Sequence, residues 1–311
     1  MDKSVVPDGI DLISLNMPVE ETFFRMLRYR EFDVAEMSLS SFVMSCFSEE
    51  RPFVAIPIFP SRFFRHSSIY VNEQSGIRTP QDLLGRRVGS PEYQMTAPVW
   101  IRGILADEYG VRPDGVTYYT GGEEAPNRSE KLPVSLPDNF IVNRIGPAQT
   151  LSAMLRDGEI DALYTARKPS SYDGPGGKVR RLFEDFVEVE RAYFRKTGIF
   201  PIMHTIVIRR EIYEANRWVA QSLYKAFCES KRRTYQDLQE TAALKATVPW
   251  LAAHIEDARR EMGDDFWSYG FANNRKTLDT FLRYSFEQGL SKRLLSAEEI
   301  FVPETMESYV I

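Results

Sequence analysis

The sequence predicts an α/β protein built from two similar lobes, and a short internal repeat is the first observation that predicts it. The stretch "MLRYREFDVAE" at residues 26–36 returns as "MLRDGEIDALY" at residues 154–164, with Met-Leu-Arg, an acid, an apolar residue and Asp in the same places. Each copy has the pattern of a helix that ends just before a short apolar strand. The alternative is that such joints simply recur, as they do in any α/β protein.

The surroundings of the two copies are also alike. In the first copy we expect a helix over residues 20–30, a strand over "FDVAEMS" and a helix over "SLSSFVMSCF". In the second we expect a helix over residues 147–159, a strand over "IDALYTA" and the polar turn "RKPSSYDGPGG". Ligands of open α/β sheets bind beyond the carboxyl ends of the strands, so two such units would present polar loops to each other.

The segment between the copies predicts a binding feature of its own. Thr79 and Pro80 should begin a short helix that ends at Gly85, followed by the strand "RRVGS" and the loop "PEYQ". A helix should then start at Thr96 or Ala97. That start leaves backbone amides near residues 94–97 unpaired and pointing outward, which favours a carboxylate or a phosphate.

The rest of the chain is predicted to be mainly helical and contains no long linker. Residues 200–233 read as a strand followed by a long amphipathic helix, and further helices are expected over residues 247–263, 275–290 and 296–300. Two lobes without a single linker indicate that the chain crosses between them more than once.

Composition excludes several classes of protein. The 311 residues are 43% hydrophobic and 27% charged, with a net charge of −5, as in a soluble globular protein of about two domains. No basic run points to nucleic acid, no apolar run reaches the ~20 residues that span a membrane, and no secretory leader is visible, so a cytoplasmic location is expected. Cys46 and Cys228 fit buried thiols better than a disulfide. No clustered His or Cys ligands and no glycine-rich phosphate loop occur, so neither a metal nor an organic cofactor is predicted.

Candidate binding residues lie on the loops that this scheme brings to the cleft. They are Ser38, Ser40 and Ser41 after the first strand, Tyr93, Gln94 and Thr96 at the helix start, and Arg167, Lys168 and Ser171 after the strand of the second repeat. For the serines and Thr96, helix capping is an equally good explanation.

Further candidates are basic or aromatic. Arg102 can reach the cleft or face solvent, whereas Trp100 reads as core. Arg65 and His66 precede a strand near the expected hinge, where they are either surface residues or the positive charge for an anionic ligand. His254 reads as structural. His204 lies where the chain should return to the first lobe, and it is either a core histidine or a cleft residue.

Longer motifs carry a resemblance to a known family. "IRTPQDLLGRRVG" is similar to the phrase that opens the second lobe of the type 2 periplasmic-binding-protein fold. Residues 32–42, 88–111, 200–213 and 264–290 together resemble the 4,5-dihydroxyphthalate decarboxylase family, intracellular proteins that use this fold for catalysis. The resemblance runs from Gly9 to about Pro303 and implies mixed sheets flanked by helices, with a C-terminal helical segment. Residues 1–84 and 200–311 would form the first lobe with the C-terminal helices, and residues 85–199 the second.

One feature departs from the family pattern. Members normally begin with a strand and a helix before a segment such as "PDGIDL", and this chain starts at that segment. We therefore expect either a further segment upstream or a first lobe that lacks part of its sheet.

The resemblance also implies a reaction. The expected activity is decarboxylation of an aromatic dicarboxylate, 4,5-dihydroxyphthalate giving 3,4-dihydroxybenzoate and CO2. His204 would donate the proton or tune a ring hydroxyl, while the amides near Thr96, with Arg102 or Arg167, would hold the remaining carboxylate. The alternative is a solute-binding or ligand-sensing protein for a small carboxylate, without chemistry. The sequence leaves a homo-oligomer open.

Overall fold

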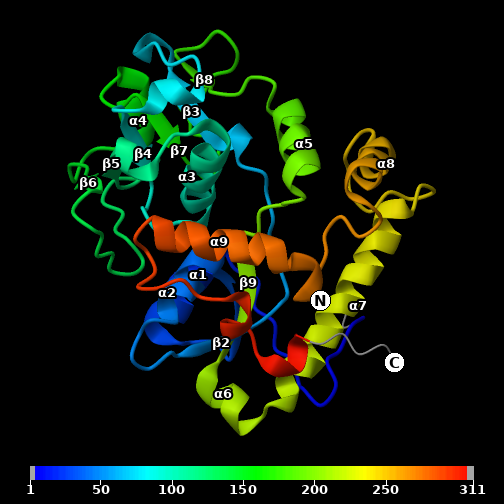
Figure 1. Cartoon of the computed structure of the whole chain (residues 1–311). Helices are drawn as coiled ribbons and strands as arrows, with labels where there is room; N and C mark the ends of the chain where they lie inside the picture. Colours follow the sequence, from blue (N-terminus) through cyan, green and yellow to red (C-terminus); the bar gives the residue numbers. More distant parts are fainter. Residues whose placement is uncertain (1–3, 307–311) are drawn as a thin grey trace.

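The computed structural model describes residues 4–306, which form two β-sheets with helices packed around them (Figure 1). The smaller sheet has the order β1-β9-β2, and the larger has the order β6-β5-β4-β7-β3-β8. The strands are β1 (Val34–Ser38), β2 (Phe53–Ile56), β3 (Ile69–Asn72), β4 (Arg87–Ser90), β5 (Thr117–Thr120), β6 (Ile141–Arg144), β7 (Ala162–Tyr164), β8 (Val179–Arg181) and β9 (His204–Arg209). We call the part built on the smaller sheet the first lobe and the part built on the larger sheet the second lobe.

The strand directions confirm the predicted mixed α/β class. In the second lobe β4 runs parallel to β5 and β7, and β5 runs parallel to β6, whereas β3 is antiparallel to both β7 and β8. The carboxyl ends of these four parallel strands therefore meet at one edge of the sheet. In the first lobe both β1 and β2 pair antiparallel with β9, so the end of β1 lies beside the start of β9.

The α-helices flank the sheets and also form a C-terminal layer. They are α1 (Val19–Tyr29), α2 (Leu39–Ser45), α3 (Thr96–Tyr109), α4 (Leu151–Asp157), α5 (Phe186–Thr197), α6 (Arg210–Ala215), α7 (Trp218–Gln239), α8 (Leu251–Met262) and α9 (Arg275–Glu287). Helix α9 lies across the middle of the molecule between the two sheets, and α7 and α8 stand together at one side (Figure 1). None of the helices in residues 4–306 is long and apolar enough to cross a membrane.

Both copies of the repeat fold as a helix followed by a strand, α1 into β1 and α4 into β7. The Asp that the copies share accepts hydrogen bonds from an arginine on a neighbouring strand. Arg209 Nη2 of β9 donates to Asp33 Oδ1 at 2.8 Å, and Arg87 of β4 donates to both oxygens of Asp161 at 2.8 and 3.0 Å. The repeated Asp thus joins the beginning of its strand to the adjacent strand, which explains why an acid recurs there.

The chain crosses between the lobes twice, and the two crossing segments lie side by side. The amide of Phe63 donates to the carbonyl of Pro201 at 3.1 Å, and the amide of Met203 donates to the carbonyl of Ser61 at 2.9 Å. The first crossing lies between β2 and β3, earlier than the predicted boundary after residue 84, because β3 already belongs to the larger sheet. We call the paired segments, residues 61–63 and 201–203, the hinge ladder.

Other local predictions need correction. The long helix expected after β9 is broken at Asn216 into α6 and α7, and residues 80–83 and 297–299 form 3₁₀ turns instead of α-helices. Met95 precedes α3 as its N-cap residue, so Thr96 is the first helical residue and not the cap. His254 is exposed on α8. Cys46 and Cys228 form no disulfide, as predicted, but they are partly and not fully buried, and desolvation raises the pKa of Cys46 to about 11.

Helices α3 and α9 pack closely enough to require a glycine. Trp100 is fully buried beside Phe281 and Tyr284, and its indole nitrogen donates to the carbonyl of Ile202 at 2.9 Å, which confirms the core prediction. A Cβ at Gly103 would lie 2.1 Å from a ring carbon of Tyr284. The ring has little freedom to move, because its hydroxyl donates to Asp107 at 2.6 Å.

We therefore expect Gly103→Ala to destabilise the protein by about 1–3 kcal/mol, the usual cost of overpacking a core. The free energy of unfolding, measured in urea for the native protein and the variant, checks this expectation. An unchanged free energy of unfolding would show that α3 and α9 can accommodate the added methyl group without loss of stability.

Candidate functional site

Polar side chains from the two lobes meet at the end of β1. Ser38 Oγ lies 2.8 Å from Thr96 Oγ1, the amide of Ser40 donates to Thr96 Oγ1 at 3.0 Å, and Ser41 Oγ donates to Gln94 Oε1 at 3.0 Å. All of these side chains are buried. The loop after β1 thus meets the start of α3, as expected, whereas no hydrogen bond of the described residues joins it to the loop after β7. We call the contact between the loop after β1 and the start of α3 the seam.

Local geometry explains why these residues reach the seam. Ser38 ends β1 and accepts from the amide of Ser41 at 3.5 Å, so it caps α2 as well as touching the second lobe. Thr96 has no role as a cap, and its hydroxyl is free to cross to the first lobe. The capping explanation therefore holds for Ser38 and not for Thr96, and ligand contact by either residue stays a prediction.

Two backbone amides near the start of α3 are not free, which limits the sequence-based prediction of an open anion site there. The amide of Met95 donates to the carbonyl of Glu92 at 3.2 Å, and the amide of Tyr93 donates to Glu130 Oε1 at 2.6 Å. A carboxylate of the chain itself therefore occupies part of the position that was predicted for a ligand anion.

A buried ionic cluster that the sequence did not reveal supports the second-lobe side of the seam. Glu92, which follows β4, is fully buried and accepts from Gln94 Nε2 at 2.9 Å, from Lys131 Nζ at 2.5 Å and from Arg128 Nη2 at 2.6 Å. Gln94 thereby links the carboxylate to Ser41 in the other lobe. The charge-rich stretch "GGEEAPNRSEKLP" was the signal that could have pointed to this cluster.

An ion pair between the lobes lies next to this cluster. Glu20, in the first turn of α1, approaches Arg128 and Arg167 of the second lobe at 3.4 Å each. Arg128 is mostly buried, whereas two thirds of the Arg167 side chain is exposed. Two arginines of the second lobe thus converge on one carboxylate of the first lobe, an arrangement that suits recognition of a carboxylate.

His204 lies on the first-lobe side of the seam, at the exit of the hinge ladder. It stands opposite Ser38 in the β1/β9 register, and its backbone amide donates to the carbonyl of Ser61 at 3.3 Å. Its Nδ1 is 2.5 Å from Glu36 Oε1, and Phe23 of α1 packs edge-on against the ring at 4.9 Å. The side chain is 18% exposed. The carboxylate and the aromatic ring together fix the orientation of the imidazole and leave Nε2 for another partner.

Arg65 lies buried between the hinge ladder and the loop after β7. Its guanidinium reaches Met203 Sδ at 2.8 Å and the carbonyl of Ala166 at 3.3 Å. Burial lowers the pKa of Arg65 to about 10, and Glu190 partly opposes this effect. Arg65 therefore connects the segment that leads into His204 with the segment that carries Arg167.

Three predicted residues lie inside the fold instead of at the seam. Arg102 donates to Gln288 Oε1 and to the carbonyl of Tyr93, each at 2.6 Å, and stacks over the Tyr93 ring at 4.0 Å. Tyr93 is buried and donates to the carbonyl of Gln288 at 3.2 Å. His66 is buried against Phe183 and Tyr193, and desolvation lowers its pKa to about 4, so it is neutral.

The last two candidates follow β7 at the periphery. Lys168 is exposed. The amide of Ser171 donates to Ser152 Oγ at 3.0 Å, and its own hydroxyl, like that of Ser40, makes no hydrogen bond with the described residues. Ligand contact by these side chains remains a prediction.

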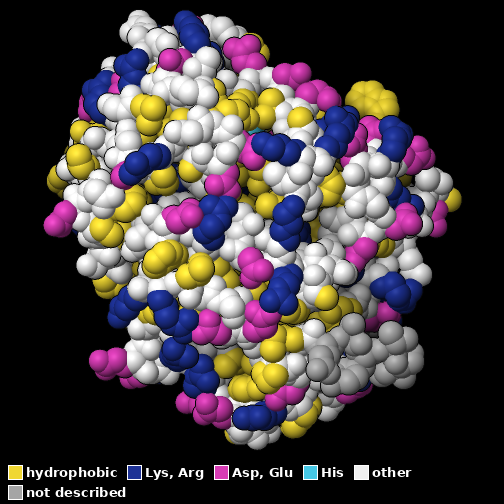
Figure 2. All heavy atoms as spheres, viewed as in Figure 1, with side chains coloured by type: hydrophobic (Ala, Val, Ile, Leu, Met, Phe, Trp, Pro, Cys, Tyr) yellow, Lys and Arg dark blue, Asp and Glu magenta, His cyan; other side chains and the backbone are white. Residues whose placement is uncertain are grey.

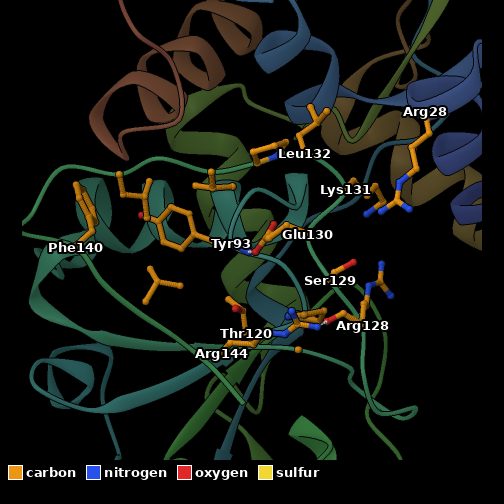
Figure 3. Close-up of a pocket in the computed structure, with 16 residues that line it drawn as sticks. Arg28, Tyr93, Thr120, Arg128, Ser129, Glu130, Lys131, Leu132, Phe140 and Arg144 are labelled. Carbon is orange, nitrogen blue, oxygen red and sulfur yellow. Dashed lines mark hydrogen bonds between the residues drawn. The ribbon is translucent and has the colours of Figure 1, made fainter. Parts of the chain in front are cut away.

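A cavity of about 680 Å³ opens beside Arg128 (Figure 3). Its size is in the range of small-molecule sites. Cationic side chains from both lobes line it, together with one carboxyl group and an apolar wall. The lining includes Arg28, Arg128, Lys131, Arg144, Glu130, Tyr93, Leu132 and Phe140. Since Arg128 also belongs to the ion pair with Glu20, the cavity adjoins the seam.

The outer surface shows no comparable concentration of one charge on the face seen in Figure 2, where acidic and basic side chains are interspersed. Within residues 4–306 no group of three or more His, Cys, Asp or Glu side chains is placed to hold a metal ion. The cationic character of the site therefore comes from arginine and lysine side chains at the junction of the lobes.

Glu130 gives the site a measurable pH dependence. Burial raises its pKa to about 7, with the charge of Glu92 adding to the rise and the amide of Tyr93 opposing it. Between pH 4.5, the ordinary pKa of a glutamate, and about pH 7, the folded protein keeps a proton that the unfolded chain releases. Stability should therefore fall as the pH rises through this interval.

We expect Glu130→Gln to reduce the loss of stability as the pH rises, because glutamine keeps an acceptor for the Tyr93 amide and has no charge to bury. Thermal midpoints measured at about pH 5 and about pH 8 check this. Glu49→Gln, at an exposed position, is the control and should leave the fall unchanged. If the thermal midpoint falls equally in both variants, Glu130 is not the source of the pH dependence.

Comparison with known proteins identifies relatives of the whole chain. The chain is 41% identical to a 4,5-dihydroxyphthalate decarboxylase of Comamonas testosteroni over 311 residues, which covers all of this chain and 94% of the relative. It is 42% identical over 185 residues to a 4,5-dihydroxyphthalate decarboxylase of Pseudomonas putida, covering 60% of this chain and 72% of the relative. No protein-family model matches.

The solved structures that align with the chain share little sequence with it. A periplasmic sulfonate-binding protein from Methylobacillus flagellatus aligns with a TM-score of 0.47 at 13% identity, covering 92% of this chain and 77% of that protein. The desulfurization enzyme DSZB aligns with a TM-score of 0.42 at 12% identity, covering 88% and 84%. The family therefore follows from the full-length relative: the chain belongs to the 4,5-dihydroxyphthalate decarboxylase family.

Proposed function

We propose that this protein removes one carboxyl group from an aromatic dicarboxylate, converting 4,5-dihydroxyphthalate into 3,4-dihydroxybenzoate and CO2. The full-length relative carries the name of this activity. The residues at the seam and at the ion pair beside it supply the groups that the reaction needs: cations for a carboxylate, a group for proton transfer and an environment with little water.

The observation that carries the proposal is that α1 connects His204 to a carboxylate held by two second-lobe arginines. Phe23 of α1 packs against the His204 ring, and Glu20 in the first turn of the same helix meets the two arginines. The Glu20 carboxylate oxygens lie 3.4 Å from the guanidinium nitrogens of Arg128 and Arg167, and this distance is longer than that of a good ionic hydrogen bond. A substrate carboxylate would displace Glu20 and take the same two guanidinium groups. The aromatic ring would then extend towards His204.

His204 is suited to act on a ring hydroxyl. Glu36 takes Nδ1, so Nε2 is the nitrogen that remains for the substrate. In the proposal His204 either donates the proton that replaces the carboxyl group or removes the proton of the hydroxyl para to that carbon. Removal of the hydroxyl proton pushes electrons into the ring at the carbon that must be protonated.

The buried seam supports the loss of CO2. Because Ser38 and Thr96 bond directly to each other across the lobes, water has little access along this side. A dry site disfavours the negative charge of the departing carboxylate and favours neutral CO2. Contact between the lobes is therefore part of the proposed mechanism.

Location and assembly complete the proposal. We expect the reaction to take place in the cytoplasm, where a catabolic enzyme meets its substrate, and a homo-oligomer stays open. Binding of a small carboxylate without chemistry is the alternative function. Incubation of the purified protein with 4,5-dihydroxyphthalate, followed by measurement of CO2, separates the two. Binding without any product would support the alternative.

For the same reaction we expect His204→Ala to lower the turnover rate by roughly 10²–10⁴-fold, the usual contribution of a general acid or base. His254→Ala, a change to the exposed histidine of α8, is the matched control and should turn over normally. A near-normal rate for His204→Ala would remove His204 from catalysis.

A further inference from the structure

A second titratable group lies at the carboxyl edge of the parallel strands in the second lobe. Glu123 follows β5, and the loop that carries it is fixed by the start of α4, whose amides at Leu151 and Ser152 donate to the carbonyls of Gly122 and Glu123 at 2.9 and 3.1 Å. Neither the repeat nor the resemblance pointed to this residue.

The two carboxyl oxygens of Glu123 differ in their surroundings. Oε2 accepts from Thr165 Oγ1 at 2.6 Å, whereas Oε1 is buried and has no hydrogen-bond partner among the described residues. Thr165 follows β7 and is itself fully buried. The group is thus oriented by one short hydrogen bond, with its second oxygen free for another partner.

The charges around Glu123 come from several elements. Burial raises its pKa to about 7, Glu124 adds to the rise, and the Thr165 hydroxyl with the charges of Arg167 and Arg128 opposes it. Tyr70 of β3 is also within electrostatic range, and Arg181 of β8 stacks over its ring. A proton on this carboxyl is consequently available near neutral pH.

The position of Glu123 relates it to the seam. Thr165, which holds the carboxyl, is followed by Ala166, whose carbonyl accepts from Arg65, and then by Arg167, which pairs with Glu20. Arg128 and Arg167 both influence Glu123 electrostatically, and both hold the carboxylate of Glu20. Glu123 therefore stands on the second-lobe side of this carboxylate site, whereas His204 stands on the first-lobe side.

The reaction requires proton transfer at two ends of one ring. The ring carbon that bears the leaving carboxylate must receive a proton, and the hydroxyl para to it must release electron density. These two atoms lie on opposite sides of the ring, so one side chain cannot serve both. A ring held between the lobes would present one of them to each lobe.

We propose that Glu123 is the proton donor to the ring carbon, which assigns His204 the para hydroxyl. This inference rests on the proposed decarboxylation and adds a second catalytic residue to it. The Glu123 carboxyl gives its proton to the carbon that bears the carboxylate, and a C–H bond forms. The C–C bond to the carboxylate then breaks, its electron pair returns to the ring, and CO2 leaves.

The remaining protons balance through His204 and water. His204 takes the proton of the para hydroxyl as the ring is protonated and returns it when the aromatic ring is restored. The Glu123 carboxylate regains its proton from solvent after product release. The net change is one proton taken up for each CO2 released.

Three other glutamates near the junction of the lobes fit this role less well. The Glu92 oxygens are occupied by Arg128, Lys131 and Gln94. Glu36 holds the His204 ring. Glu130 has a free oxygen, but its other oxygen accepts from the Tyr93 amide, and no hydrogen bond of the described residues joins it to the loop after β7.

The test compares Glu123→Gln with Glu124→Gln, the same change at the next residue, where the carboxylate is exposed and bonds to Ser170. We expect Glu123→Gln to lose roughly 10²-fold or more in kcat, the contribution of a general acid, while the affinity for 4,5-dihydroxyphthalate stays within a few-fold. Glu124→Gln should keep its kcat when both variants are measured at about pH 5, because the charge of Glu124 acts on Glu123 only through its pKa and both forms are protonated there. A normal kcat in Glu123→Gln would overturn the inference.

The pH profile provides a readout that a purely structural role would not move. With Glu123 as the acid, kcat/KM of the native enzyme should fall as the pH rises through about 7, because the proton is lost. Thr165→Val removes the hydrogen bond that lowers this pKa, so the fall should move to higher pH. A fall at the same pH in the native enzyme and in a folded Thr165→Val variant would contradict the assignment.

These outcomes are distinct from failure of the proposed function. If the native protein releases CO2 from 4,5-dihydroxyphthalate and Glu123→Gln does so equally fast, the inference fails and the function stands. If the native protein binds the compound and releases no CO2, the function fails and the inference falls with it. Thermal unfolding of each variant shows whether a loss of activity reflects a loss of fold.

Discussion

The buried carboxylate of Glu92 is the constraint on which the arrangement of the lobes depends. An ionised group that is removed from water must be paired and fully hydrogen-bonded, and here Arg128, Lys131 and Gln94 satisfy it. The same groups have second functions. Gln94 accepts the Ser41 hydroxyl from the first lobe, and Arg128 also faces Glu20. The buried anion therefore holds in place the side chains that meet the other lobe, so a ligand carboxylate would find Arg128 already oriented.

Most of the fold could be predicted because it follows from local patterns. The two copies of the repeat folded as expected, since helical spacing of apolar residues and short apolar strands are properties of the chain itself. The break of the expected long helix at Asn216 is local and was missed. The placement of β3 depended on distant partners, because β3 joins the larger sheet by pairing with β7 and β8. Neither pairing leaves a trace in the residues near it.

The site was less predictable, for a physical reason that single residues illustrate. Ser38, Ser41, Gln94 and Thr96 follow strands, and the carboxyl ends of strands meet ligands or facing lobes, so their contact could be expected. Arg102 lies in a helix whose first ten residues are all buried, and its partner Gln288 comes from the far end of the chain. Glu92 and Glu123 read as surface acids, because burial of a charge depends on partners that the sequence does not bring together.

The hinge ladder connects the architecture to the proposed chemistry. His204 begins β9 immediately after the second crossing segment, and its amide bonds to Ser61 in the first. Glu123 belongs to the other lobe, so no rigid element carries both residues. Their separation is set by how the lobes meet across the crossing segments. A ring compound could contact Arg128 and Arg167 on one side and His204 on the other. Its binding would span the junction of the lobes and place the two proton-transfer groups at opposite ends of the ring.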